Sequence, residues 1–249
     1  MVSPNIGILL KLYLNNMLSI IIPTLNEEKY LPLLIDSIHR QDFSDYEIIV
    51  SDANSEDKTR EIAIAKGAMV VVDERRHPSF QRNTGAKAAQ GDTFLFLDAD
   101  SVLPDNFLST VVKEFQNRKL GVAGFYLNFG SNKFIYRLCS LGYNFFAWFR
   151  QYWRPISVGA GIMVRSDVHR RINGFDETLF VAEDFDYCYR SSRIAKFRLL
   201  KMVRLPYSIR RMEKEGDFKV LLKWLKMGTR TIWGGRIKKK IVKYDFGNY

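Results

Sequence analysis

Residues 90–100 read QGDTFLFLDAD, and the rest of the chain is organised around them. An apolar run, residues 93–97, follows a glycine turn and ends at two carboxylates, Asp98 and Asp100. A run of this length between polar residues is typical of a strand buried on both faces of a parallel sheet. Open α/β sheets bind ligands beyond the carboxyl ends of their strands, and residues i and i+2 of an extended chain point the same way. The two aspartates are therefore predicted to face one cation or polar ligand.

Apolar runs of strand length alternate with amphipathic helical segments on both sides of this stretch. The predicted strands cover residues 18–22, 47–50, 69–72, 93–97 and 120–127; the predicted helices begin near Asn26, cover 57–66 and 81–90, and start again at Pro104. This alternation indicates a doubly wound, mostly parallel α/β sheet with flanking helices. Polar clusters follow the first, second and fourth strands, so we expect them at one edge of the sheet, where they would make a site.

Two later segments add to this expectation. Residues 156–164, ISVGAGIMV, predict a glycine-rich strand whose backbone something approaches closely. Glu183 and Asp184 open a predicted helix over 185–196, where the helix dipole and any neighbouring cation would keep Asp184 ionised. Taken alone, this acidic pair is better explained as ordinary acids at a helix start.

An aromatic segment covers residues 134–153 and holds nine aromatic side chains. Its uncharged part, residues 138–149, is shorter than the roughly 20 residues that cross a membrane. The segment is therefore not predicted to span a membrane. It fits an aromatic core helix, a lid or a membrane-facing acceptor surface.

The positive charge is concentrated at the C-terminal end. Residues 204–249 hold 13 Lys and Arg against 4 Asp and Glu, a net charge of +9 out of the total of +11. Within them, residues 218–233 predict a helix with Lys219, Lys223, Lys226 and Arg230 along one side, which suits an anionic membrane surface or a helix packed on the domain with a solvated basic face. We expect an N-terminal extension over 1–17, a main α/β domain over 18–205 and a basic amphipathic helical tail over 206–249.

The sequence also bears on the compartment. Cys139 and Cys188 lie in apolar surroundings without a CxxC spacing, which indicates buried thiols in a reducing compartment. The first sixteen residues lack the features of a signal peptide. We expect a cytoplasmic protein, with a peripheral position on the inner face of the cell membrane if the tail binds lipid.

The polar clusters favour one kind of chemistry. The chain has neither the GxGxxG nor the GxxxxGK[ST] nucleotide motif, and no GxSxG elbow of a serine hydrolase. Asp, Asn, Thr and Arg at a sheet edge with a second acidic pair downstream suit a metal-bound diphosphate and a separate carboxylate base. Arg82 and Arg210 would add charge-assisted contacts to phosphate oxygens.

Five stretches in a fixed order carry a family resemblance. They are SIIIPTLNEEKYLPLLIDSI, IIVSDANSEDKT, QRNTGAKAAQGDTFLFLDAD, SVGAGIMVRSDVHRRINGFDE and AEDFDYCYR, between about Leu18 and about Arg211. In these stretches the chain resembles the family 2 glycosyltransferases, which have the GT-A fold. The resemblance implies a nucleoside-diphosphate sugar as donor, Mg²⁺ or Mn²⁺ as cofactor, and inversion at the anomeric carbon.

The resemblance also implies roles for individual residues. The nucleotide sugar would be held by Pro23, Thr24, Glu27, Asp52, Arg82, Asp98 and Arg210. Asp100, together with Asp98, would bind the metal, and Asp184 would be the general base. Gly159, Ala160, Gly161 and Glu183 would lie on the acceptor side.

The chain departs from the usual family pattern in two places, and other functions are kept as alternatives. The usual D-D-G-S is SDANS at residues 51–55, and the Gln-x-x-Arg-Trp signature of polymerising members is replaced by SIRR at 208–211. A single sugar transfer to a lipid, glycan or protein hydroxyl is therefore expected. The alternatives are a nucleotidyltransferase acting on a sugar phosphate, although residues 23–27 have no glycine for its phosphate loop, and a non-catalytic nucleotide-sugar or polyanion-binding protein. Nucleic acid is not an expected partner, because the basic charge lies outside the main domain.

Overall fold

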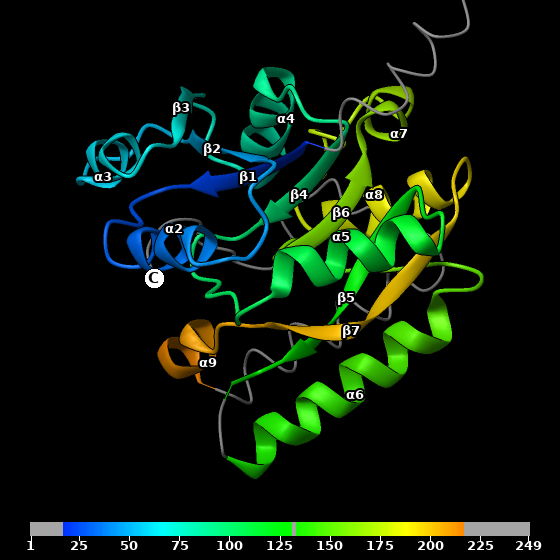
Figure 1. The fold of residues 1–249 in the computed structure, drawn as a ribbon. Coiled ribbons are helices and arrows are strands. Elements are labelled where there is room, and N and C mark those ends of the chain that lie inside the picture. The colour runs from blue at the N-terminus through cyan, green and yellow to red at the C-terminus, as the bar shows by residue number, and fades with distance from the viewer. Residues whose placement is uncertain (1–16, 131–132, 217–249) are drawn as a thin grey trace, which may run out of the picture.

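A seven-stranded sheet organises the part of the chain that the computed structural model describes, residues 17–130 and 133–216 (Figure 1). The strands are β1 (Leu18–Thr24), β2 (Tyr46–Asp52), β3 (Met69–Val72), β4 (Thr93–Leu97), β5 (Val122–Asn128), β6 (Gly161–Arg165) and β7 (Phe197–Pro206). Their order is β3-β2-β1-β4-β6-β5-β7. β6 is antiparallel to both of its neighbours, whereas the other strand pairs are parallel. The predicted doubly wound, mostly parallel α/β sheet is confirmed.

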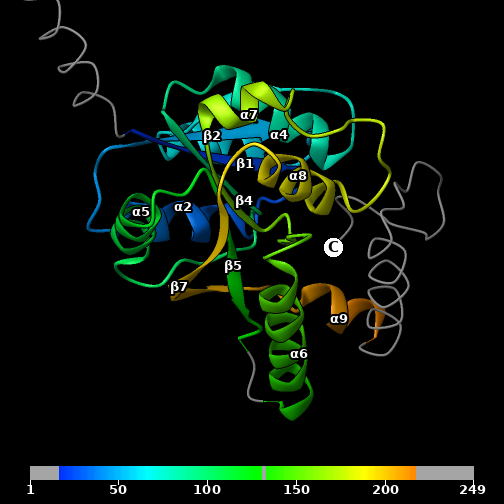
Figure 2. The same ribbon diagram turned by 90° about the vertical axis from the view of Figure 1, so that its right-hand side faces the viewer.

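Helices cover both faces of this sheet. They are α2 (Leu31–His39), α3 (Thr59–Ala65), α4 (Pro78–Ala88), α5 (Phe107–Asn117), α6 (Phe134–Arg150), α7 (Ser166–Arg171), α8 (Glu183–Ser192) and α9 (Arg210–Glu215). Figure 2 shows α2 and α5 on one side of the sheet and α4, α7 and α8 on the other. Alternate residues of one strand serve the two cores: Ile20 and Ile22 pack in the cluster with α2 and α5, and Ile21 packs in the cluster with α4.

The predicted strands at the centre agree with the structure, and several predicted ends do not. β3 and β4 have the predicted bounds. Asn26 does not cap the first helix, because it has a left-handed φ of 56° and its side chain accepts a hydrogen bond from the Glu56 amide; α2 begins five residues later, at Leu31. α4 begins at Pro78 rather than at 81, since His77 caps it and proline fits the first turn of a helix.

Two further differences concern the second half of the sheet. The predicted strand over 156–164 is shorter, and only Gly161–Arg165 is β-structure. β7 was not predicted at all. Its ten residues include Arg198, Lys201 and Arg204, and these charges interrupt the apolar pattern that identifies a strand.

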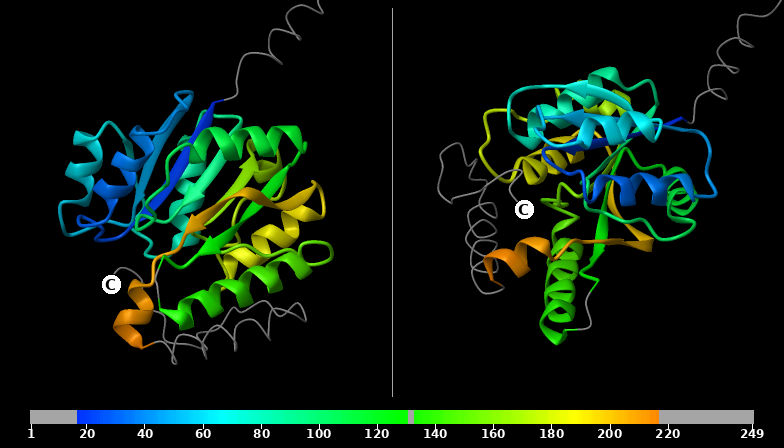
Figure 3. Two further views of the ribbon diagram at one scale, coloured as in Figure 1. Left: turned by 60° about the horizontal axis from the view of Figure 1, so that its bottom comes forward. Right: turned by 90° about the vertical axis from the view of Figure 1, so that its left-hand side faces the viewer.

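α6 is the predicted aromatic segment, and it lies outside the sheet along β5 (Figures 1 and 3). The expectation of a core helix holds for Tyr136 and Ala147, which are buried, and is wrong for Phe134 and Phe145, which are 78% and 67% exposed. Among the helices of residues 17–130 and 133–216, none has the length and apolar character needed to cross a membrane. The predicted extension over 1–16 and the predicted basic helix over 218–233 lie outside the described residues.

Candidate active site

Asp52 organises the loops that follow β1 and β2. The parallel register places Thr24 opposite Asp52, and the Thr24 hydroxyl donates a hydrogen bond of 2.9 Å to the Asp52 carboxylate. The amide and hydroxyl of Ser55 donate to the same carboxylate at 2.8 and 2.5 Å, and Arg60 Nε lies 3.8 Å away. The carboxylate is fully buried. Through these buried hydrogen bonds, Asp52 fixes the shape of the predicted nucleotide loop next to Pro23 and Thr24.

Arg210 ties the C-terminal end of the described chain to this edge of the sheet. It comes from α9, and its two terminal nitrogens donate to the two carboxylate oxygens of Glu27 at 3.0 and 2.9 Å. The same guanidinium lies 3.4 Å from Asp100 and 4.4 Å from the Tyr30 ring centroid. Burial raises the pKa of Glu27, and the hydrogen bond and charge of Arg210 oppose that shift. A residue late in the sequence thus joins the loops after β1 and β4.

Arg82 connects the Asp-x-Asp turn with the second acidic pair. Its side chain, from α4, is only 3% exposed. One terminal nitrogen donates to Asp98 at 3.1 Å and the other to Glu183 at 2.8 Å. The ring of Phe175 lies 5.4 Å below the guanidinium. Since Glu183 directly precedes Asp184, Arg82 brings the two predicted acidic sites into one cluster.

Asp184 is held by backbone groups at the start of α8. The Gly159 amide donates to one carboxylate oxygen at 2.8 Å, and the Phe185 amide donates to the other at 2.8 Å. Burial, reinforced by the neighbouring charge of Glu183, raises the pKa of Asp184 to about 8. The charge of Arg82 and the two amides act in the opposite direction but are outweighed. The expectation that the dipole and a cation keep this group ionised is therefore wrong, because burial dominates.

The predicted close approach to the backbone of the glycine-rich segment is confirmed, and the groups that approach it are side chains of the protein itself. A Cβ built on Gly159 would lie 2.2 Å from Arg82, and one built on Gly161 would lie 2.4 Å from Leu205 and 2.8 Å from Phe125. Gly159, Ala160 and Gly161 are all buried. The structure places Gly159 beside Asp184, whereas Gly161 begins β6 in the core.

Asp98 and Asp100 lie in a turn directly after β4, which the Ser101 amide closes by donating to the Asp98 carbonyl at 3.1 Å. Burial within the fold raises the pKa of Asp98, and the charges of Asp100 and Glu183 add to the effect of burial, although 38% of the Asp98 side chain remains exposed. Among the described residues, no group of three or more His, Cys, Asp or Glu side chains could hold a metal ion by itself. Two carboxylates fit a Mg²⁺ or Mn²⁺ ion that takes its other ligands from a diphosphate and water.

Sequence reasoning placed Ser55 in the polar cluster after the second strand, and its hydrogen bonds complete the Asp52 cluster. It missed three other residues of this region. Tyr30 lies against Arg210, and Phe175 lies against Arg82. Tyr143 of α6 lies beside Ser157 and close enough to Asp184 to interact with its charge. No local pattern identifies these three, because each is far in sequence from its partner.

Comparisons with known proteins agree with this architecture. A family model described as glycosyl transferase family 2 matches residues 19–172. A GalNAc(5)-diNAcBac-PP-undecaprenol β-1,3-glucosyltransferase of Campylobacter jejuni is 36% identical over 104 residues, which are 39% of this chain and 34% of the relative. A dolichyl N-acetyl-α-D-glucosaminyl phosphate 3-β-D-2,3-diacetamido-2,3-dideoxy-β-D-glucuronosyltransferase of Methanococcus voltae is 32% identical over 113 residues, 42% of this chain and 35% of the relative. The matched residues thus span about a third of either curated relative.

Solved structures share the fold. The mannosyltransferase PcManGT from Pyrobaculum calidifontis, in complex with GDP-Man and Mn²⁺, matches with a TM-score of 0.65 at 20% identity, over 78% of this chain and 57% of that chain. At this identity the likeness shows the fold. The family model covers more than half of the sequence, with the Asp-x-Asp turn and Arg82 inside the match, and the chain therefore belongs to glycosyl transferase family 2.

Proposed function

We propose that the protein is an inverting glycosyltransferase that moves a single sugar from a nucleoside-diphosphate sugar to a hydroxyl of a lipid-linked acceptor. Membership of the family supports the reaction class. Both relatives named above carry a long-chain lipid in the name of their acceptor, undecaprenol in one and dolichol in the other. The match to this family does not favour the nucleotidyltransferase or the non-catalytic alternatives.

The donor would bind at the edge formed by the loops after β1, β2 and β4. Asp98 and Asp100 would hold Mg²⁺ or Mn²⁺ together with diphosphate oxygens, and the ion, when bound, supplies Lewis-acid stabilisation of the departing diphosphate. Arg82 and Arg210 already point at these two carboxylates, so they can exchange carboxylate for phosphate oxygens with little movement. Pro23, Thr24, Glu27 and Asp52 would shape the nucleotide side of the same edge.

The acceptor would meet the donor beside Asp184. Asp184 removes the proton of the acceptor hydroxyl, the oxygen forms a bond to the anomeric carbon, and the bond from that carbon to the diphosphate oxygen breaks. The nucleoside diphosphate leaves on the opposite face with the bonding electron pair, so the configuration inverts. Gly159 holds the carboxylate, and Glu183 raises its proton affinity. A raised pKa suits a base that must accept a proton near neutral pH.

One observation carries the proposal: Arg82 contacts both Asp98 and Glu183, so the acids proposed for the donor side and for the acceptor side lie in one cluster. The experiment is Asp184→Asn, measured by nucleotide binding and by sugar transfer. Loss of general-base help should lower turnover roughly 10²–10⁴-fold, with nucleotide affinity nearly unchanged. The matched control is Asp186→Asn, an acid of the same helical turn that pairs with Arg190. Near-wild-type turnover in Asp184→Asn would refute the assignment.

The proposed reaction implies two further partners, a membrane surface and a particular donor nucleotide. A lipid-linked acceptor would bring the protein to a membrane surface, and the basic segment 218–233 is retained as a proposed contact with anionic lipid there. The donor nucleotide and sugar are best identified by a thermal-shift panel of nucleoside diphosphates with and without Mn²⁺.

A further inference from the structure

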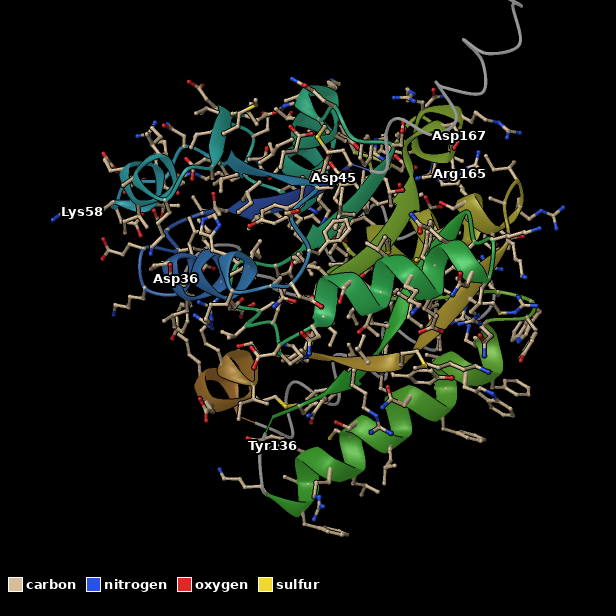
Figure 4. All side chains as sticks on the ribbon, viewed as in Figure 1. Asp36, Asp45, Lys58, Tyr136, Arg165 and Asp167 are labelled. Carbon is tan, nitrogen blue, oxygen red and sulfur yellow. The ribbon has the colours of Figure 1, made fainter. Side chains whose placement is uncertain are left out.

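One face of α6 is apolar and exposed over its full length. Its members recur at intervals of four and three residues, which places them on a single side of the helix. They are Phe134 (78% exposed), Leu138 (53%), Leu141 (62%), Phe145 (67%), Trp148 (45%) and, two residues beyond the helix, Tyr152 (64%). Figure 4 shows side chains of α6 pointing away from the sheet. A contiguous apolar surface of this kind marks a site of protein or membrane contact.

The opposite side of α6 is firmly attached to the fold. The Asn144 side chain exchanges two hydrogen bonds with the backbone of Leu127 in β5, at 2.8 and 3.0 Å. The Phe129 amide donates to the Ser140 hydroxyl at 3.1 Å. Tyr136 and Ala147 are buried on this side. Because these contacts fix the rotation of the helix about its axis, the aromatic face is held on the side of α6 that points away from β5.

The segments that carry this face and its C-terminal end hold basic side chains and no acidic ones. The sequence has no Asp or Glu between Glu114 and Asp167, or between Asp186 and Glu213. At the C-terminal end of α6, the Arg198 guanidinium lies 4.8 Å from the Tyr152 ring and that of Arg154 lies 4.5 Å from the Tyr189 ring.

Arg150 lies on the attached side of α6, beneath this face. It is 1% exposed, and no hydrogen-bond partner of its Nη1 is found among the described residues. Its carbon atom Cζ lies 5.3 Å from the Phe146 ring and 5.7 Å from the Trp153 ring.

We propose that α6 docks the protein flat on the surface of an anionic phospholipid bilayer. The aromatic and leucine side chains would enter the boundary between headgroups and acyl chains, with Arg154 and Arg198 at the level of the lipid phosphates. Tryptophan and tyrosine favour this boundary because their rings are both apolar and polar.

Charge distinguishes the bilayer from the other possible occupants. A symmetric contact between two copies of α6 would bring equal basic surroundings together, which is unfavourable. Residues 217–249 hold nine Lys and Arg against two Asp, so they carry the same sign of charge as the α6 surroundings. An anionic bilayer is the occupant that complements both the apolar face and its basic rim.

The position of α6 connects docking with the active site, and this step rests on the proposed function. Tyr143, on the inner side of α6, lies beside Ser157 and Val158 and close enough to Asp184 to interact with its charge. A helix with its side chains is about 10–12 Å across. Docking through the outer face would therefore hold the bilayer about one helix diameter from the loop that carries Gly159, where a lipid-linked acceptor must present its sugar.

The test uses the full chain and vesicle co-sedimentation. The vesicles are phosphatidylcholine alone, or an equimolar mixture of phosphatidylcholine and phosphatidylglycerol. Leu141→Ser with Phe145→Ser removes two apolar contacts and should lower binding to the anionic vesicles roughly tenfold or more. The matched control, Leu33→Ser with Ile64→Ser, changes two apolar residues of similar exposure (52% and 64%) on α2 and α3 and should bind like the wild type. Equal binding of the two double variants would overturn the proposal.

A second measurement leaves α6 intact and so does not depend on the folding of a variant. The sequence has four tryptophans, and replacing Trp224 and Trp233 by Phe leaves Trp148 and Trp153. Their emission should shift to shorter wavelength with anionic vesicles and be quenched by brominated acyl chains. An unchanged spectrum would overturn the proposal.

Two other outcomes would also overturn it, and both are independent of sugar transfer. If replacing Lys219, Lys223, Lys226 and Arg230 by Gln abolishes vesicle binding while the α6 variant binds normally, the C-terminal segment alone carries the docking. If sedimentation velocity shows a wild-type dimer that the α6 variant converts to a monomer with unchanged vesicle binding, the face is a self-association interface. Failure of the Asp184 experiment would refute the glycosyltransferase mechanism and leave these binding results unaffected.

Discussion

The guanidinium of Arg82 fills the space in which a side chain at position 159 would lie. A Cβ built on Gly159 would be 2.2 Å from Arg82 Nη2 and 2.8 Å from its Cζ. Arg82 cannot move aside at low cost, because it is buried and bonded to Asp98 and Glu183. Gly159 itself holds Asp184 through its amide. The absence of a side chain at 159 is therefore a condition for the assembled site.

We expect Gly159→Ala to reduce sugar transfer strongly, because the added methyl group displaces Arg82 and with it both carboxylates. The matched control is Gly142→Ala in α6, where a Cβ would meet nothing within 4 Å. Alanine at that helical position should stabilise the fold by roughly 0.5–1 kcal/mol without loss of transfer. Steady-state kinetics and thermal unfolding of both variants are the measurements. Wild-type turnover in Gly159→Ala would show that the position of Arg82 does not matter for transfer.

The raised pKa of Asp184 gives a pH dependence with a definite sign. The base must be deprotonated to act, so kcat/KM should rise with pH through a midpoint near 8, which reports the free enzyme. Glu183→Gln removes the nearby negative charge and leaves Arg82 with fewer partners, and both effects lower the pKa of Asp184. The rising limb of the plot of kcat/KM against pH should therefore move to lower pH. Asp167→Asn, an exposed acid bonded to Arg165, is the control that should leave the limb in place. A limb at the same pH in Glu183→Gln would exclude Asp184 as the titrating base.

The central strands and the meeting of candidate site residues at one edge of the sheet could be predicted, because both depend on local patterns. β4 and the turn with Asp98 and Asp100 follow from an apolar run that two acids end, and the parallel register then brings Thr24 next to Asp52. Arg210 was proposed for phosphate binding, and the structure places it 3.4 Å from Asp100.

What the sequence did not reveal depends on distant contacts. The proton affinity of Asp184 is set by burial, which no neighbour in sequence reports. The exposure of the α6 aromatics depends on which side of the helix β5 occupies, and composition alone favoured a core helix as much as a surface one.

His169 makes stability depend on pH in the acid range. It is buried, its Nδ1 lies 2.8 Å from the Tyr187 hydroxyl, and burial, followed by the charges of Arg170 and Arg190, lowers its pKa to about 4. In the unfolded chain the His169 imidazole takes up a proton as the pH falls through about 6.5, whereas in the folded chain it stays neutral until about pH 4. Its contribution to the free energy of unfolding is therefore fully present above pH 6.5 and is lost as the pH falls toward 4. The loss attributable to this group is up to about 3 kcal/mol. Urea unfolding at paired pH values should show a shallower dependence in His169→Gln, which keeps a polar partner for Tyr187. The same slope in both proteins would contradict this account.

Asp100 is expected to make nucleotide binding metal-dependent. In the wild type, Mn²⁺ should increase the thermal stabilisation produced by a nucleoside diphosphate, because the ion would take oxygen ligands from the Asp100 carboxylate and from the diphosphate. Asp100→Asn should reduce that increment and leave the metal-free shift nearly unchanged. Asp105→Asn, an acid just outside the turn, is the control and should behave like the wild type. An increment that survives in Asp100→Asn would place the ion elsewhere.

Arg210 tests whether α9 contributes to the donor site. Its guanidinium bonds both oxygens of Glu27 and lies 3.4 Å from Asp100, so a bound diphosphate would be within its reach. A hydrogen bond to a charged group contributes about 1.5–3 kcal/mol, and Arg210→Ala should therefore weaken nucleoside-diphosphate binding roughly 10- to 100-fold. Arg165→Ala removes an arginine that likewise makes two bonds to one carboxylate, that of Asp167, at a distance from α9 (Figure 4). Calorimetric titration of both variants separates the roles. Equal affinities would mean that Arg210 only fastens α9 to Glu27, whereas selective loss in Arg210→Ala, with the unfolding temperature preserved, would make it a ligand of the diphosphate.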